Sequence, residues 1–274
     1  MTSFKASDGA ELYFTDEGAG LPVLCLAGLT RNGTDFDYIA PHLEGIRLIR
    51  LDYRGRGQSD WSGPETYTLQ REGMDAVELL DHLALEKAAI LGTSRGGIIA
   101  MGLAATVKQR LIGVCLNDIG PELASGGLDA IKDYLGRRPA FKTREAAVAA
   151  MATRMAGFEN VPTERWRAEA DKHYIEDDRG LTFNYDPALR EAVLESAAQN
   201  LTPDLWPFFD ALQGLPLALI RGANSDLLTA ETAAKMQDRR PDMLFTDVPD
   251  RGHVPFLDEP ACVLTIKAWL EECR

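Results

Sequence analysis

The stretch Gly92-Thr93-Ser94-Arg95-Gly96-Gly97 decides the fold of this chain. It follows the apolar run 88–91 and precedes the helix-like stretch 98–105, so the sequence predicts a strand, a tight turn and a helix with a serine at the apex. Such a turn exposes the Ser94 hydroxyl at the positive N-terminal end of a helix. Glycine suits the flanking positions because side chains there would collide with the adjoining strand and helix. The pattern therefore indicates a serine nucleophile.

Size and charge exclude several classes of function. The chain has 274 residues, of which 45% are hydrophobic, enough for a large buried core. Its formal net charge of −13 repels nucleic acid and anionic membrane surfaces. The N-terminal residues show no secretory signal pattern, and no apolar run is long enough to span a bilayer. We therefore expect a cytoplasmic protein, monomeric or homodimeric, that binds neither nucleic acid nor membranes.

The four cysteines, Cys25, Cys115, Cys262 and Cys273, lack the paired spacing of a zinc site or a redox motif. Cys25 and Cys115 lie in apolar runs typical of central strands, so we expect buried free thiols. A reducing compartment fits this pattern. We expect neither a metal nor an organic cofactor.

The order of strand and helix patterns indicates two regions. Strand patterns alternate with helical ones, which predicts a mostly parallel sheet covered by helices on both faces. The strand patterns occupy residues 23–27, 46–51, 88–91, 111–117, 216–220 and 243–248. Residues 121–207 show no convincing strand and predict a helical cap over the carboxyl edge of the sheet, where ligands bind in such folds. We therefore expect a core domain of residues 1–120 and 208–274 and a cap of residues 121–207.

A serine nucleophile needs a base to take its proton and an acid to orient the base. Of the four histidines, His253 lies in a loop after the last predicted strand, from which it could reach Ser94. Asp226 follows the strand at 216–220 and is the expected acid, with a turn or N-cap role before the next helix as the alternative. The chain order Ser94, Asp226, His253 is then nucleophile, acid, base.

Acyl transfer also needs donors for the oxyanion of the tetrahedral intermediate. We expect these donors to be the backbone N–H of Arg95, directly after the nucleophile, and that of Leu29, in the loop after the strand at 23–27. The Arg95 side chain itself is expected on the helix surface, in contact with the cap. The residues expected to line the substrate pocket are Gly28, Thr30, Trp166, Trp206 and Val254.

Four motifs in order resemble those of the α/β-hydrolase superfamily, in its capped small-molecule branch. They are the turn 92–97, the loop Asp52-Tyr53-Arg54-Gly55-Arg56-Gly57-Gln58-Ser59, the acid turn 222–226 and the base loop 252–255. The resemblance covers nearly the whole chain outside the cap. It implies the α/β-hydrolase fold, with a mostly parallel eight-stranded sheet flanked by helices and a helical cap inserted after the sixth strand.

Three positions bear on the branch of this superfamily. The family commonly has His-Gly before the oxyanion-hole residue, where this chain has Ala27-Gly28. Carbon–carbon bond hydrolases often have tryptophan after the catalytic histidine, where this chain has Val254. A serine at the position of Ser94 argues against haloalkane dehalogenases and epoxide hydrolases, which need a carboxylate nucleophile.

These features predict a hydrolase that cleaves a small carboxylic ester or lactone through an acyl-enzyme on Ser94. Its expected partner is a small ester, lactone or related acyl compound. Hydrolysis of a carbon–carbon bond in a dienoic keto acid is the alternative, because it uses the same three residues. A ligand receptor on a hydrolase fold, with slow turnover or none, is a second alternative.

Overall fold

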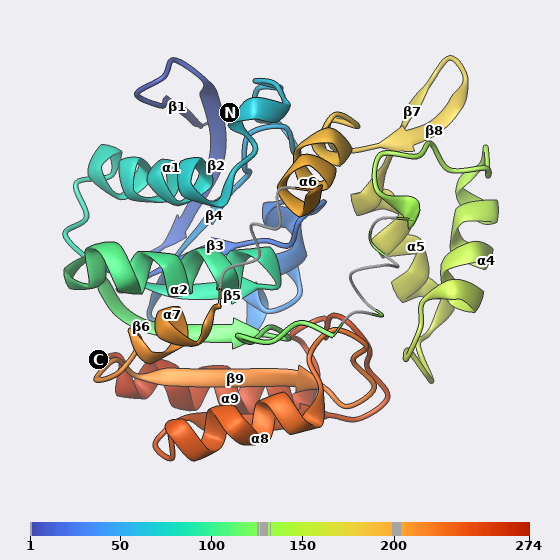
Figure 1. Ribbon diagram of the computed structural model, residues 1–274. Helices are drawn as coiled ribbons and strands as arrows, with labels where there is room; N and C mark the ends of the chain where they lie inside the picture. Colours follow the sequence, from blue (N-terminus) through green and yellow to red (C-terminus); the bar gives the residue numbers. More distant parts are fainter. Residues whose placement is uncertain (1, 125, 127–130, 132, 199–203) are drawn as a thin grey trace.

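The computed structural model describes residues 2–124, 126, 131, 133–198 and 204–274. Eight strands form one sheet in the order β1-β2-β4-β3-β5-β6-β9-β10 (Figure 1). β2 is antiparallel to β1 and β4, and the other neighbouring strands are parallel. The predicted mostly parallel, eight-stranded sheet is therefore confirmed. The strands are β1 (Ser3–Lys5), β2 (Glu11–Gly18), β3 (Leu21–Leu26), β4 (Ile46–Leu51), β5 (Ala88–Thr93), β6 (Leu111–Asn117), β9 (Leu217–Gly222) and β10 (Leu244–Val248).

Helices cover both faces of this sheet, which explains the continuous apolar runs of its central strands. α1 (Leu69–His82) and α2 (Arg95–Val107) lie on one face, and α9 (Pro260–Glu272) packs against β9 and β10 on the other (Figure 1). α8 (Ala230–Arg239) follows β9, and the short α7 (Trp206–Asp210) contacts α2. The short 3-10 turns are η1 (Gly33–Asp37), η2 (Ala40–His42), η3 (Pro64–Thr66) and η4 (Lys108–Arg110). All four cysteines are buried and free, as expected for Cys25 and Cys115.

The elements between β6 and α7 lie outside the main sheet. They include α4 (Arg144–Arg154), α5 (Thr163–His173) and α6 (Leu189–Ala198). In Figure 1 they lie on the side toward which the arrowheads of β6 and β9 point. This places them over the carboxyl edge of the sheet.

One expectation about this region was wrong. Residues 121–207 contain a small antiparallel hairpin of β7 (Tyr174–Asp177) and β8 (Gly180–Phe183). Each strand has only four residues, and only β8 alternates buried and partly buried side chains. Strands this short carry too little periodicity to stand out from the surrounding helical pattern.

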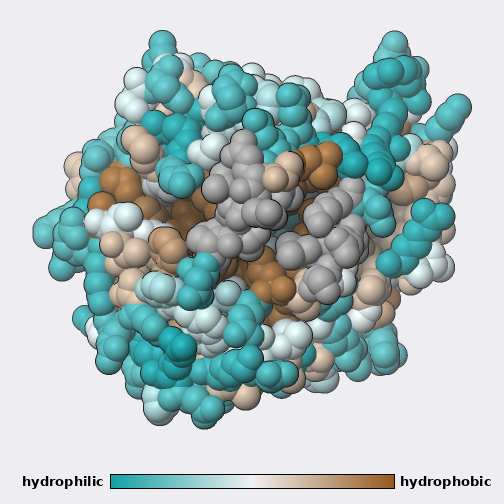
Figure 2. Space-filling view, viewed as in Figure 1, coloured by the Kyte–Doolittle hydropathy of each residue, from teal (hydrophilic) through white to brown (hydrophobic). Residues whose placement is uncertain are grey.

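In Figure 2, hydrophilic side chains dominate the outer parts of the face, and apolar ones gather toward its middle. Among the described residues, no helix combines the length and the apolar character that a bilayer crossing requires.

Candidate active site

Ser94 occupies the sharp turn between β5 and α2. Its φ of +51° is in the left-handed region, which is strained for a residue with a side chain. The glycines around it permit the turn: a Cβ at Gly96 would lie 2.0 Å from the carbonyl oxygen of Leu26 in β3. A Cβ at Gly92 would lie 2.7 Å from the backbone of Gly96. The strand, turn and helix predicted around Ser94 are therefore present, and the side chain remains partly exposed.

The His253 ring lies between Ser94 and a buried carboxylate. Its Nε2 is 2.9 Å from Ser94 Oγ, and its Nδ1 is 2.7 Å from Oδ2 of Asp118. Asp118 follows β6 directly and is fully buried. Because a carboxylate only accepts hydrogen bonds, Nδ1 carries the proton and Nε2 is free to accept the Ser94 hydroxyl. Three side chains distant in sequence thus form one hydrogen-bonded chain.

Asp118 is held by two further donors. The backbone N–H of Gly222 donates to Oδ1 at 2.8 Å, and the Ser225 hydroxyl donates to Oδ2 at 2.7 Å. Both belong to the turn after β9. This turn, which the sequence suggested as the source of the acid, instead supplies donors that fix a carboxylate from the neighbouring strand.

The prediction of Asp226 as the partner of His253 was therefore wrong. Asp226 is exposed on that turn, and Asp118 occupies the Nδ1 side of the ring. The order of the strands explains the difference. β5 and β6 are neighbours, with Thr93 paired to Asn117, so Ser94 and Asp118 follow directly from paired positions about 5 Å apart. β9 is one strand further away, at about twice that spacing.

The geometry around the two expected oxyanion donors leaves them free for a ligand. The backbone N–H of Arg31 donates to the carbonyl of Gly28 at 3.1 Å. Since the N–H of Leu29 belongs to the same trans peptide, it points the opposite way. Arg95 is the first residue of α2, where backbone N–H groups have no partner within the helix. Neither N–H donates to another group of the chain among the described residues.

The side chain of Arg95, expected in contact with the cap, makes its hydrogen bonds to Glu72 of α1 and to Tyr67. Its Nε donates to Glu72 Oε2 at 2.5 Å, and Nη2 donates to the carbonyl of Tyr67 at 3.0 Å. Arg56 donates to the same Glu72 carboxylate at 2.8 Å and to the carbonyl of Leu29 at 2.9 Å. Burial disfavours ionised Glu72, but the two guanidinium groups outweigh it and lower the pKa of Glu72. This buried network ties the loop at Leu29 to α1 and to the start of α2.

A cavity of about 490 Å³ opens in front of Ser94 and His253. Loops at the edge of the main sheet and the segment between β6 and α7 both line it, and three expected pocket residues, Gly28, Thr30 and Val254, are among the lining residues. This volume suits a small organic substrate.

Neither Trp166 nor Trp206, both expected in the pocket, lines this cavity. Trp166 is 4% exposed and packs inside the cap, with its ring centroid 5.7 Å from that of Phe158. The Trp206 indole donates to Glu122 at 2.9 Å and packs on Phe209. Their large apolar surfaces are used to pack the cap and to join α7 to the core.

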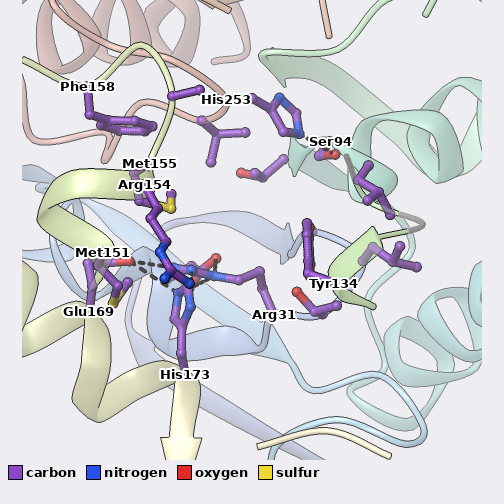
Figure 3. A pocket seen from close by; sticks show the side chains of 18 of the residues that line it. Arg31, Ser94, Tyr134, Met151, Arg154, Met155, Phe158, Glu169, His173 and His253 are labelled. Atoms are coloured by element: carbon purple, nitrogen blue, oxygen red, sulfur yellow. Dashed lines mark hydrogen bonds and ion pairs between the residues drawn. The ribbon is translucent and has the colours of Figure 1, made fainter. Parts of the chain in front are cut away.

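A charged cluster lies on the cavity wall where the loop after β3 meets α5 (Figure 3). Arg31 donates two bonds from Nε to Asp35, at 2.9 and 2.8 Å, and one from Nη2 to Glu169 at 2.8 Å. Its Nη1 lies 3.2 Å from Nδ1 of His173. The Tyr38 hydroxyl donates to the other oxygen of Glu169 at 2.8 Å. This cluster was not predicted from the sequence, because its members come from two regions more than 130 residues apart.

The cluster shifts the titration of its members. Burial, helped by the nearby Arg31 charge, lowers the pKa of His173 to about 3, so this ring is neutral at pH 7. Burial alone would raise the pKa of Glu169, but Arg31 outweighs it and holds that pKa at about 2. The cluster therefore contains a charged Arg31, a charged Glu169 and an uncharged imidazole. Among the described residues, no group of three or more His, Cys, Asp or Glu side chains is arranged to hold a metal ion.

Known proteins similar in sequence and structure identify the family to which this fold belongs. Residues 23–263 match the alpha/beta hydrolase family. The chain is 38% identical over 248 residues to a 3-hydroxybutyrate-oligomer hydrolase of Cupriavidus necator, covering 87% of this chain and 84% of that protein. It is 28% identical over 260 residues to a 2-(acetamidomethylene)succinate hydrolase of Mesorhizobium japonicum, covering 94% and 89%. The crystal structure of an alpha/beta hydrolase from Novosphingobium aromaticivorans superposes with a TM-score of 0.91 at 36% identity, covering 99% of this chain and 97% of that one. The fold, the arrangement around Ser94 and these similarities lead to one conclusion: the chain belongs to the alpha/beta hydrolase family.

Proposed function

We propose that this hydrolase cleaves a small carboxylic ester or lactone through an acyl-enzyme on Ser94. The observation that carries the proposal is the hydrogen-bonded chain from Ser94 through His253 to Asp118. A serine hydroxyl becomes a nucleophile when a base within hydrogen-bond reach takes its proton. The carboxylate behind that base fixes its tautomer and stabilises its charged form.

The acylation step follows from this geometry. Ser94 Oγ attacks the acyl carbon while its proton passes to Nε2 of His253. The tetrahedral oxyanion accepts hydrogen bonds from the backbone N–H groups of Leu29 and Arg95. As the intermediate collapses, the His253 imidazolium donates its proton to the leaving alcohol, and the acyl group remains on Ser94.

Deacylation repeats the sequence with water. His253 takes a proton from a water molecule that attacks the acyl carbon, and the same donors hold the second oxyanion. Ser94 leaves with the proton returned by His253, and the carboxylic acid product is released. Asp118 accepts the hydrogen bond from Nδ1 throughout and orients the ring.

The proposal extends to a division of the chain into a catalytic core and a cap. Residues 1–120 and 208–274 form the catalytic core, and residues 121–207 form a cap that closes over the substrate. Support comes from the cavity wall, to which both parts contribute side chains. A cavity shared in this way lets cap residues select the substrate while the core performs the chemistry.

The relative from Cupriavidus necator is a 3-hydroxybutyrate-oligomer hydrolase, which favours ester over carbon–carbon bond cleavage. The test is a panel of a 4-nitrophenyl ester, a linear dimer of 3-hydroxybutyrate, a lactone and a dienoic keto acid. It is run with the wild-type chain and with Ser94→Ala. We expect turnover of esters by the wild type and a fall of several orders of magnitude in kcat for Ser94→Ala.

Mass spectrometry of the wild type, quenched during turnover, checks the intermediate. It should show an acyl adduct on the peptide containing Ser94. Wild-type turnover by Ser94→Ala would exclude the mechanism. Bleaching of the dienoic acid without ester cleavage would favour the carbon–carbon alternative, and product that never exceeds one equivalent per chain would favour a receptor.

A further inference from the structure

The cavity wall holds three arginines that the proposed chemistry does not use. Arg31, Arg137 and Arg154 all line the cavity. Arg31 is fully engaged, since its nitrogens contact Asp35, Glu169 and His173. Its charge is therefore already paired within the protein.

Arg154 and Arg137 differ from Arg31. Neither guanidinium makes a hydrogen bond or an ion pair with any residue that the structure describes, and both side chains are exposed. Arg154 ends α4, and Figure 3 shows its side chain extending toward the group formed by Arg31, Glu169 and His173. Arg154 thus presents an unpaired guanidinium inside a cavity that also contains the nucleophile.

The Arg31 cluster leaves little for Arg154 to bind within the protein. Both oxygens of Glu169 already accept hydrogen bonds, from Arg31 and from the Tyr38 hydroxyl. The His173 ring is neutral and accepts from Arg31 at Nδ1. The Arg154 guanidinium, which is exposed and has no side-chain partner among the described residues, is therefore available to a ligand in the cavity.

We propose that Arg154, with Arg137 beside the same cavity, binds a free carboxylate of the substrate at a distance from the scissile ester. This inference rests on the proposed ester hydrolysis at Ser94. A guanidinium matches a carboxylate in a two-point, charge-assisted arrangement. The substrate class is then an ester of a carboxylic acid that keeps one ionised carboxylate, such as a short hydroxy-acid oligomer. Asp226 also lines the cavity, and its charge disfavours binding the carboxylate on that side.

In this arrangement, the separation between Arg154 and Ser94 selects the ester bond that is cleaved. When the terminal carboxylate is held by Arg154, the ester bond that reaches Ser94 is fixed by the number of atoms between them. The enzyme then cleaves a defined bond near the carboxyl end of a short oligomer rather than any accessible ester. A neutral ester of the same shape binds without this anchor.

The test compares the linear dimer of 3-hydroxybutyrate with its methyl ester, which has the same internal ester bond but no carboxylate. The variants are Arg154→Met, Arg154→Lys and a matched control, Arg167→Met. Arg167 is an exposed arginine of α5 that does not line the cavity. Chromatography of released 3-hydroxybutyrate gives kcat/KM for the internal ester in each case.

We expect Arg154→Met to lower kcat/KM for the dimer about 10- to 100-fold, mainly through KM, the loss expected for a charge-assisted hydrogen bond. Cleavage of the methyl ester should change less than about threefold. Arg154→Lys should restore part of the loss, and Arg167→Met should match the wild type. Equal losses on both substrates, or none on either, would overturn the proposal.

A binding measurement separates this proposal from the proposed function. In the Ser94→Ala background, calorimetric titration with the dimer should show binding that Arg154→Met weakens about 10- to 100-fold. Such weakening without dimer turnover by the wild type would support the carboxylate site and contradict the ester chemistry. Ser94-dependent turnover of the dimer with no effect of Arg154→Met would support the ester chemistry and contradict the carboxylate site.

Discussion

Oδ2 of Asp118 lies 2.7 Å from Nδ1 of His253, although 135 residues separate them in the chain. Asp118 directly follows β6, and Ser94 directly follows the neighbouring strand β5. The acid and the nucleophile therefore leave the sheet from adjacent strands. His253 reaches them from the loop after the last strand, β10. This one contact decides which carboxylate supports the base, and the mutational expectations for the site follow from it.

Asp118→Asn should lower kcat roughly 10³- to 10⁴-fold with little change in KM, because an amide no longer fixes the tautomer of His253. Steady-state kinetics on the best ester of the panel measures this effect. Asp226→Asn is the matched control, since it makes the same change on the turn after β9. It should retain kcat within about threefold. Larger loss in Asp226→Asn than in Asp118→Asn would contradict the assignment.

Gly96→Ala should damage the turn that carries Ser94. The added Cβ would lie 2.0 Å from the backbone oxygen of Leu26, so β3 or the turn must shift. We expect destabilisation of about 1–3 kcal/mol, as for overpacking elsewhere, together with a large fall in kcat. Thermal unfolding and ester kinetics measure the two effects.

Gly102→Ala, in the same helix α2, provides the comparison. A Cβ there meets nothing within 4 Å, so the substitution only lowers backbone freedom. It should stabilise the protein by about 0.5–1 kcal/mol without changing kcat. If both alanines had the same effect, helix propensity rather than the contact with β3 would explain the glycine at position 96.

Arg31→Met should destabilise the protein by about 3–5 kcal/mol, because it leaves the buried carboxylates of Asp35 and Glu169 without their cation. For a chain of this size the thermal midpoint should fall by roughly 10 °C. The double variant Arg31→Met/Glu169→Gln should recover part of that loss, since it removes one of the two unpaired charges. Additive effects of the two substitutions would show that the pair is not coupled.

The buried His173 makes stability depend on pH. Its folded pKa of about 3 lies below the ordinary value of 6.5, so between these values only the unfolded chain binds the proton. Stability is therefore highest above pH 6.5 and falls as the pH drops below it. From pH 7 to pH 5 the loss should reach up to about 2 kcal/mol.

His173→Gln keeps an acceptor for Arg31 but cannot titrate. Denaturant unfolding at pH 7 and pH 5 should show a smaller loss of stability in this variant than in the wild type. Glu169 does not contribute in this window, because its pKa is held at about 2. An identical pH response in both proteins would show that folding does not lower the pKa of His173.

The fold and two members of the site, Ser94 and His253, could be predicted from residue types and their spacing. The glycines around Ser94 marked the strand, turn and helix because their Cβ-free backbone is a local requirement. The continuous apolar runs predicted buried parallel strands. The position of His253 after the last strand predicted it as the base. These features depend on neighbours along the chain, so residue types and spacing reveal them.

The carboxylate that hydrogen-bonds to His253, and most of the residues that line the cavity, became known only from the folded structure. The choice between Asp118 and Asp226 depends on the order of β5, β6 and β9 across the sheet, which spacing along the chain does not encode. The packing of Trp166 inside the cap and the ion pair of Arg31 with Glu169 likewise join distant segments. Non-local contacts are set by how the elements pack, and the sequence carries them only through the completed fold.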